Sequence, residues 1–366
     1  MRDVLDDLLR WWTAGERAGL ATVTATWSSA PRQPGAAMLV GPDETAVGSV
    51  SGGCVEGAVY ELCREVAESG VPQTVRYGVT DDDAYDVGLP CGGTIELFVE
   101  PAGFPELAML AGEVHSGRPV ALLTCVEGPA ERLGRHVVLT PSGRHGSLGG
   151  DRLDDAAADD GRGLLAAGRT GLLHYGPAGE RRGTGTTVLV TSFAPAARMI
   201  VCGATDHAAA VARIGAFLGY RVTVCDARPV FATKRRFPEA DEVIVDWPHR
   251  YLAAEAEAGR LDERTAICVL THDPKFDVPV LAVALALPLG YVGAMGSRRT
   301  HDDRLKRLRE HGVPEESLAR LASPIGLDLA ARTPEETAVS VAAEIVALRW
   351  GGTGARLSET AGPVHR

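Results

Sequence analysis

The second half of the chain alternates short apolar segments with longer amphipathic ones, and this alternation restricts the fold more than any other feature of the sequence. Five apolar, β-branched segments have the composition of buried parallel strands: 199–201, 221–225, 243–245, 266–270 and 289–292. Because parallel strands joined by helices build a layered sheet, we predict a Rossmann-like, doubly wound α/β domain over residues 195–350. Residues 351–366 are predicted to form a flexible tail.

The turn after the first of these strands is a candidate nucleotide site. Gly203 opens it, and Asp226 follows 23 residues later, the separation expected between a phosphate-binding turn and a ribose-binding acid. Thr205 and Ala208 stand where the dinucleotide fingerprint has its second and third glycines, and a side chain there crowds a pyrophosphate. The turn thus indicates Rossmann architecture more strongly than NAD or FAD binding, and Asp226 either binds another polar ligand or simply ends its strand.

Other polar residues follow neighbouring strands of the same predicted sheet. His207 begins a helix, His272 follows the fourth strand, and Ser297 and Arg298 follow the fifth. Doubly wound sheets bind ligands at the carboxyl ends of their strands, where helix N-termini and guanidinium groups suit an anion such as phosphate. Each residue alone is equally consistent with capping or a solvated surface, but together they form a candidate binding rim.

In the first half of the chain, residues 48–57 read Gly-Ser-Val-Ser-Gly-Gly-Cys-Val-Glu-Gly, between a short predicted strand and a predicted helix. Such a turn exposes the backbone N–H groups of Ser51, Gly52 and Gly53 at the positive end of a helix dipole. The same field favours the thiolate of Cys54, so the turn suits an anionic ligand beside a reactive sulfur. The alternative is a tight turn that buries a small cysteine.

A second glycine-rich loop, residues 88–93, holds Cys91 in a similar setting. If the two loops meet, two thiols face one pocket, but no further pair at ligand spacing completes a zinc site. We predict that both loops belong to an N-terminal α/β domain with a mixed sheet, over residues 1–194, and that residues 194–197 are the linker.

Composition excludes several classes of function. A formal net charge of −11 without a cluster of basic residues argues against nucleic acid as a partner. The longest apolar run, 278–294, is interrupted by two prolines and is too short to span a membrane. The seven cysteines are scattered and do not suggest a disulfide framework, so we expect a reducing, cytoplasmic location.

Three blocks of sequence carry a resemblance to a known family: Gly-Ser-Val-Ser-Gly-Gly-Cys-Val-Glu at 48–56, Gly-Leu-Pro-Cys-Gly-Gly at 88–93 and Ser-Pro-Ile-Gly-Leu-Asp at 323–328. Segments 271–273 and 296–299 agree as well. In this order, over nearly the whole chain, the blocks resemble the xanthine dehydrogenase accessory family, also called XdhC/CoxI. The chain departs from the family pattern at three positions: Pro90, Thr205 and Ala330.

The resemblance implies an accessory protein, rather than a catalyst, that matures molybdenum hydroxylases of the xanthine dehydrogenase or carbon monoxide dehydrogenase type. Such a protein binds the molybdenum cofactor, keeps it while a cysteine desulfurase supplies the terminal sulfur, and delivers it to the apo-enzyme. On this resemblance Cys54 is expected to ligate the metal or handle sulfur, and the backbone N–H groups of Ser51 to Cys54 are expected to donate to an anion. Glu56 is expected to support the site or cap the helix, and Cys91 is the second candidate thiol. The oligomeric state stays open, with a homodimer among the alternatives.

Two other functions stay open. An NAD(P)-dependent oxidoreductase would use Asp226 to hold the ribose. A cysteine-dependent hydrolase would need a base near Cys54, yet the first 114 residues contain no histidine.

Overall fold

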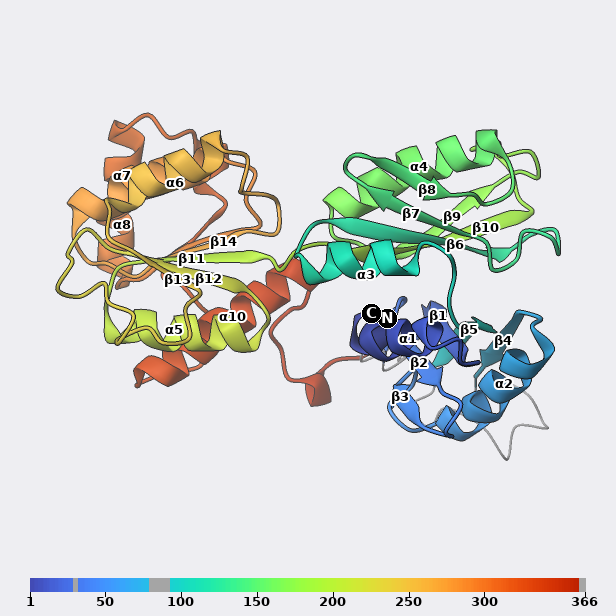
Figure 1. Ribbon diagram of the computed structural model, residues 1–366. Helices are drawn as coiled ribbons and strands as arrows, with labels where there is room; N and C mark the ends of the chain where they lie inside the picture. The colour runs from blue at the N-terminus through green and yellow to red at the C-terminus, as the bar shows by residue number, and fades with distance from the viewer. Residues whose placement is uncertain (29–31, 79–92, 362–366) are drawn as a thin grey trace. The chain divides into compact units, whose positions relative to one another are not determined.

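The computed structural model describes residues 1–28, 32–78 and 93–361 (Figure 1). The chain divides into two compact units, Met1–Pro195 and Ala196–Thr360. Cys91 and most of the loop around it lie outside the described residues. The predicted α/β class is confirmed, and each unit is described separately below.

The first sheet of the first unit has the strand order β3-β2-β1-β5-β4. Its strands are β1 (Gly19–Trp27), β2 (Ala37–Val40), β3 (Ala46–Gly48), β4 (Gln73–Tyr77) and β5 (Thr94–Pro101). Helix α2 (Glu56–Ser69) packs on one face through Val59, Cys63 and Val66. Gly19 lies so close to this helix that a Cβ atom there would stand 2.1 Å from the carbonyl oxygen of Cys63.

The second sheet of this unit has the order β8-β7-β6-β10-β9. Its strands are β6 (Val120–Glu127), β7 (His136–Thr140), β8 (Gly143–Gly146), β9 (Gly171–Tyr175) and β10 (Thr186–Phe193). Helix α4 (Asp151–Ala166) covers one face, and α1 (Leu5–Thr13) and α3 (Leu107–His115) share a core with the other face and with the first sheet.

The unit therefore differs from the single mixed sheet that the sequence led us to expect. Its described strand pairs are antiparallel in both sheets. Short connections join β2 to β3 and β7 to β8, and a hairpin of that length can only join antiparallel neighbours.

The second unit holds the predicted parallel sheet, with the order β13-β12-β11-β14-β15-β16. Its strands are β11 (Arg198–Cys202), β12 (Arg221–Cys225), β13 (Glu242–Ile244), β14 (Ala266–Val269), β15 (Tyr291–Ala294) and β16 (Leu321–Ala322). Helices α5 (Asp206–Phe217) and α10 (Pro334–Trp350) cover one face, and α6 (Pro248–Glu257), α7 (Pro274–Ala286) and α8 (Arg298–Glu310) cover the other (Figure 1). A short helix, α9 (Glu315–Leu318), precedes β16. The direction of winding changes between β11 and β14, which is where doubly wound sheets bind ligands.

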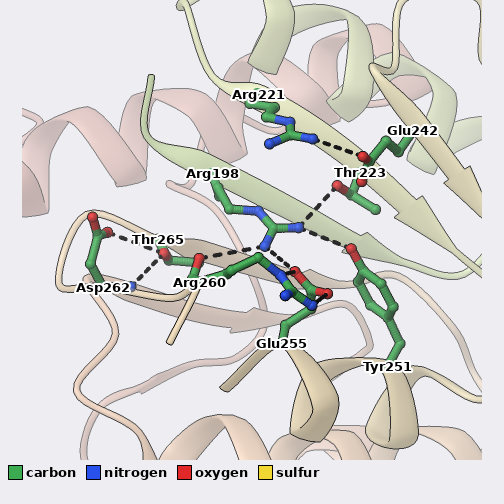
Figure 2. A network of polar contacts seen from close by, with 9 residues as sticks. All are labelled: Arg198, Arg221, Thr223, Glu242, Tyr251, Glu255, Arg260, Asp262 and Thr265. Atoms are coloured by element: carbon green, nitrogen blue, oxygen red, sulfur yellow. Dashed lines mark hydrogen bonds and ion pairs between the residues drawn. The ribbon is translucent and has the colours of Figure 1, made fainter. Parts of the chain in front are cut away.

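A buried polar network fastens the opposite, amino-terminal edge of this sheet (Figure 2). Arg198, the first residue of β11, pairs with Glu255 of α6 and donates to the Tyr251 hydroxyl at 2.9 Å. Hydrogen bonds from Arg260 and then from Arg198 outweigh burial and lower the pKa of Glu255 to about 2. Because the carboxylate stays charged and paired, α6 is held to the start of the sheet away from the candidate rim.

No helix in the described part of the chain is long and apolar enough to cross a membrane.

Candidate functional site

The turn before α2 is organised around the carboxylate of Glu56. That carboxylate accepts hydrogen bonds from the backbone N–H groups of Ser51, Gly52 and Gly53 at 2.9, 3.0 and 2.8 Å. The hydroxyls of Ser49 and Ser51 donate to it at 2.7 and 2.5 Å. Gly52 and Gly53 have φ of +82° and +117°, which turn successive N–H groups inward and favour glycine at both positions.

This geometry corrects the expectation that the N–H groups of Ser51 to Cys54 are donors for a ligand anion. The chain's own carboxylate takes three of them, and the N–H of Cys54 donates to Ser51 Oγ at 2.9 Å. Burial raises the pKa of Glu56, but the hydrogen bonds from Ser51, Ser49 and the backbone outweigh it and lower the pKa to about 2. Glu56 is the first residue of α2, and its carboxylate thus closes the turn that precedes the helix.

Cys54 lies at the edge of this turn with a free, half-buried side chain. It packs against the core between α2 and the first sheet, next to residues such as Val55 and Val59. The residue is therefore neither fully buried nor fully exposed. The turn around it is fixed by hydrogen bonds on both sides of the cysteine.

The other described cysteines are buried, as expected for structural residues: Cys63, Cys125, Cys202, Cys225 and Cys268. Burial raises the pKa of the thiols of Cys63, Cys225 and Cys268 to about 12 each. Thiols of this kind do not react readily, because the thiolate is the reactive form.

In the second unit, Gly203 and Asp226 meet at the carboxyl ends of β11 and β12. Gly203 has φ of +111°, and a Cβ atom there would lie 2.7 Å from the side chain of Thr271. The buried Asp226 accepts from Ala204 N at 2.7 Å and from Arg228 through its N–H and its guanidinium at 2.8 and 2.7 Å. Burial raises the pKa of Asp226, but the Arg228 and Ala204 hydrogen bonds outweigh it and the pKa is lowered.

The carboxylate that the sequence suggested for a ribose therefore already has partners within the chain. Thr205, which replaces the second fingerprint glycine, is the N-cap of α5 and accepts from Ala208 N at 3.1 Å. Thr205 thus serves the helix rather than the approach of a pyrophosphate.

The remaining rim residues follow β11, β14 and β15 at the same edge of the sheet. His207 lies half-buried in the first turn of α5, and His272 is exposed beside the Asp273 N-cap of α7. Ser297 is the N-cap of α8 and accepts from Thr300 N at 3.2 Å, and Arg298 beside it is exposed. The fold thus places all the predicted rim residues at one edge of the sheet. Among them, the turn that starts at Gly203 contacts Asp226 directly, through the N–H of Ala204.

A buried ion pair under this rim was missed by sequence reasoning. Arg304 and Asp277 are each 3% exposed, and their side chains meet at 2.9 Å. Arg304 also donates to Met295 O at 2.7 Å and to Ser323 Oγ at 3.0 Å, while Thr271 donates to Asp277. Burial raises the pKa of Asp277 despite these partners. The available signal was Arg304 itself, which stands four residues before Leu308 on the buried face of α8.

The fold and these turns define the class of protein: an α/β unit whose cysteine turn is closed by a carboxylate, followed by a Rossmann-type domain. Residues 199–345 match the XdhC Rossmann domain, and residues 11–78 and 114–176 match the XdhC and CoxI family. The chain belongs to the XdhC and CoxI family.

Its relatives include a Bacillus subtilis protein described as a probable xanthine dehydrogenase subunit, 28% identical over 91% of this chain and 94% of that protein. The molybdenum cofactor insertion chaperone PaoD of Escherichia coli is 28% identical over 92% of this chain and 85% of its own length. A crystal structure described as a xanthine dehydrogenase from Bacillus halodurans matches with a TM-score of 0.68 and 24% identity, over 97% of each chain. That last likeness supports the fold.

Proposed function

We propose that this protein is a maturation factor that binds the molybdenum cofactor and delivers it, with its terminal sulfur in place, to an apo molybdenum hydroxylase. A cysteine desulfurase is the proposed source of that sulfur. The observation that carries the proposal is the half-buried, free thiol of Cys54 on a fixed turn, in a chain similar over most of its length to a molybdenum cofactor insertion chaperone.

The chemistry of Cys54 fits this cargo. A thiolate is a soft ligand and suits a molybdenum centre or a persulfide intermediate in sulfur transfer. Glu56 keeps the turn in one conformation, so the sulfur is presented without an ordering cost at the moment of binding. When bound, the cofactor supplies the metal and the dithiolene, while the protein positions and protects them.

The N–H groups of the Cys54 turn are not available to an anion, because Glu56 occupies them. Independently of that turn, we propose that the second unit binds an anionic group at its own rim, through Ser297 and Arg298 at the start of α8 and through His207 and His272. Helix N-termini and guanidinium groups bind phosphate in many folds.

Co-purification tests this proposal. Protein from a host that makes the cofactor should release a fluorescent pterin after acid oxidation, and Cys54→Ala should lose that pterin while its unfolding transition is unchanged. Cys125→Ala, which removes a buried thiol from the same unit, is the matched control and should keep the pterin. Full pterin content in Cys54→Ala would contradict the role of this thiol.

The NAD(P)-dependent alternative has a direct test in the same preparations. Asp226 is engaged by Ala204 and Arg228, so we expect no saturable change in fluorescence on titration with NADH or NADPH. Saturable binding that Asp226→Asn abolishes would favour the oxidoreductase instead.

A further inference from the structure

The first unit contains a cavity of about 520 Å³ that none of the site residues above line. It lies where β5, the start of α3, the β6–β7 hairpin and the end of α1 meet. Six of its lining residues carry the argument: Trp12, Glu100, Phe104, Gly134, His136 and Ser147. Its volume falls in the range of pockets for small molecules.

Glu100 and His136 form a buried pair at one wall of this cavity. Their side chains are each 6% exposed, and His136 Nε2 lies 3.1 Å from Glu100 Oε2. On the other side of the ring, His136 Nδ1 lies 3.1 Å from Thr124 Oγ1, its cross-strand partner in β6. These contacts fix the ring, so that Nε2–H donates to Glu100 and the carboxylate is held in one orientation.

Burying a pair of this kind between two sheets costs desolvation free energy. Apolar side chains of similar volume hold such an interface at least as well, as Phe98, Val126 and Leu189 do nearby. A carboxylate has about four acceptor positions, and His136 takes one of them. Because Glu100 lines the cavity, the remaining acceptor positions are suited to a ligand with N–H donors.

The other walls suit a flat ring. Phe104 stacks on the His136 ring with centroids 4.3 Å apart, and the 41% exposed Trp12 supplies a second aromatic surface. Gly134, with φ of +71°, gives the Glu100 carboxylate room, since a Cβ there would lie 3.3 Å from its Oε2. Aromatic walls with a few fixed polar groups are typical of sites for heterocycles.

We propose that this cavity binds a heterocycle with a 2-amino-4-oxopyrimidine edge, whose ring N–H and amino group donate together to the Glu100 carboxylate. Two parallel N–H···O bonds to a carboxylate are strong and select for this edge. Pterins and guanine share the edge, and a pterin is the source expected if the protein carries the molybdenum cofactor, so this choice rests on the proposed function. Val99 packs with Cys54 on the α2 face of the first sheet, and Glu100 follows it in β5 and faces the other way, so a pterin bound here does not have its metal at Cys54 at the same time.

The test compares ligands that differ at one position. Pterin has a 2-amino group where lumazine has a 2-oxo group, so fluorescence titration of the full chain should give saturable binding of pterin and at least tenfold weaker binding of lumazine. Guanosine is the second arm. Binding of guanosine but not pterin would overturn the pterin source, and equal binding of pterin and lumazine would overturn the proposed edge.

Variants locate the site. Glu100→Gln keeps the size and loses the charge, and should weaken pterin binding about tenfold or more. Ser147→Phe fills the cavity from an exposed position, so it should abolish binding even if Glu100→Gln proves poorly folded. Glu113→Gln, in α3 but paired with Arg118 outside the cavity, is the control and should bind as the wild type does. Wild-type affinity in Ser147→Phe would overturn the proposal.

Cofactor content separates this inference from the proposed function. If the wild type and the Ser147→Phe variant carry the cofactor equally well, the proposed function stands and the cavity is not the pterin site. A protein that binds free pterin at Glu100 but never carries the cofactor supports the cavity and contradicts the proposed function.

Discussion

Glu56 and Asp226 close glycine turns in the two units, but they do so with different partners. Glu56 is held by neutral donors within eight residues of sequence: four backbone N–H groups and two serine hydroxyls. Asp226 joins the ends of two strands, through the N–H of Ala204, and adds a guanidinium from Arg228. The first carboxylate orders a local loop, and the second fastens one edge of a sheet.

The cysteines beside the two turns differ accordingly. Cys54 lies half-buried next to Glu56, while Cys202 and Cys225 lie fully buried directly before Gly203 and Asp226. A turn stabilised by its own loop can leave its cysteine at the surface. A turn at the centre of a parallel sheet buries the cysteine at its strand ends.

The largest expected difference between the two turns is in the rate at which their cysteines are alkylated. At pH 8 we expect Cys54 to react at least about 100-fold faster than Cys225, because burial first, and then Asp246, raise the pKa of Cys225 to about 12. Peptide mass spectrometry after a short pulse of iodoacetamide measures both sites. Comparable rates would mean that the two turns open to a similar extent.

Of the two carboxylates, Glu56 should contribute more to stability, so Glu56→Gln should destabilise the protein more than Asp226→Asn. Neutralising this carboxylate weakens several hydrogen bonds at once, and we expect a loss of about 2 kcal/mol in the free energy of unfolding at pH 7, after allowance for solvent screening. Urea denaturation measures it. Glu61→Gln, on the exposed side of the same helix, is the control and should change stability little.

At low pH, the difference in the free energy of unfolding between Glu56→Gln and the wild type should disappear. The folded pKa of Glu56 is lowered to about 2, so its stabilisation is complete above the unfolded value near 4.5 and is lost as the pH falls from there towards 2. Denaturation series at pH 7, 4 and 3 measure the trend. A gap that stays constant over this range would show that charge is not what stabilises the turn.

Asp226→Asn should cost less, about 1.5 kcal/mol, because an amide oxygen still accepts one of the two backbone N–H bonds. The measurement is the same urea series, and hydrogen exchange at Ala204 reports the turn directly. A larger loss than that of Glu56→Gln would reverse the ranking of the two turns.

Arg228→Ala should have the smallest effect, about 0.5 kcal/mol, since this side chain is 46% exposed and Asp226 keeps its backbone donors. A loss as large as that of Asp226→Asn would show that the guanidinium, rather than the N–H groups, holds the second turn.

Local patterns in the sequence predicted the second unit well. Apolar strands with helices between them predicted the parallel sheet. The start of α10 is likewise encoded locally, by Thr333, Pro334 and Glu336, where the reciprocal capping bonds are present. Each of these signals depends on neighbours along the chain, so no long-range information was needed.

The antiparallel sheets and the carboxylate partners were harder to predict. The pairing of β1 with β5 joins residues between 67 (Trp27 and Thr94) and 82 (Gly19 and Pro101) positions apart, and neither strand carries a local pattern that identifies its partner. The Glu100–His136 pair depends on that same arrangement of sheets. Arg228, two residues after Asp226, was a local signal for an internal partner, but the spacing from Gly203 favoured a ribose instead.

The close approach of Gly19 to Cys63 has a mechanical consequence. A helix with no clearance beneath it cannot move towards the sheet on which it packs. We therefore expect α2 to act as a rigid support for the Cys54 turn, which its own hydrogen bonds already hold in one conformation.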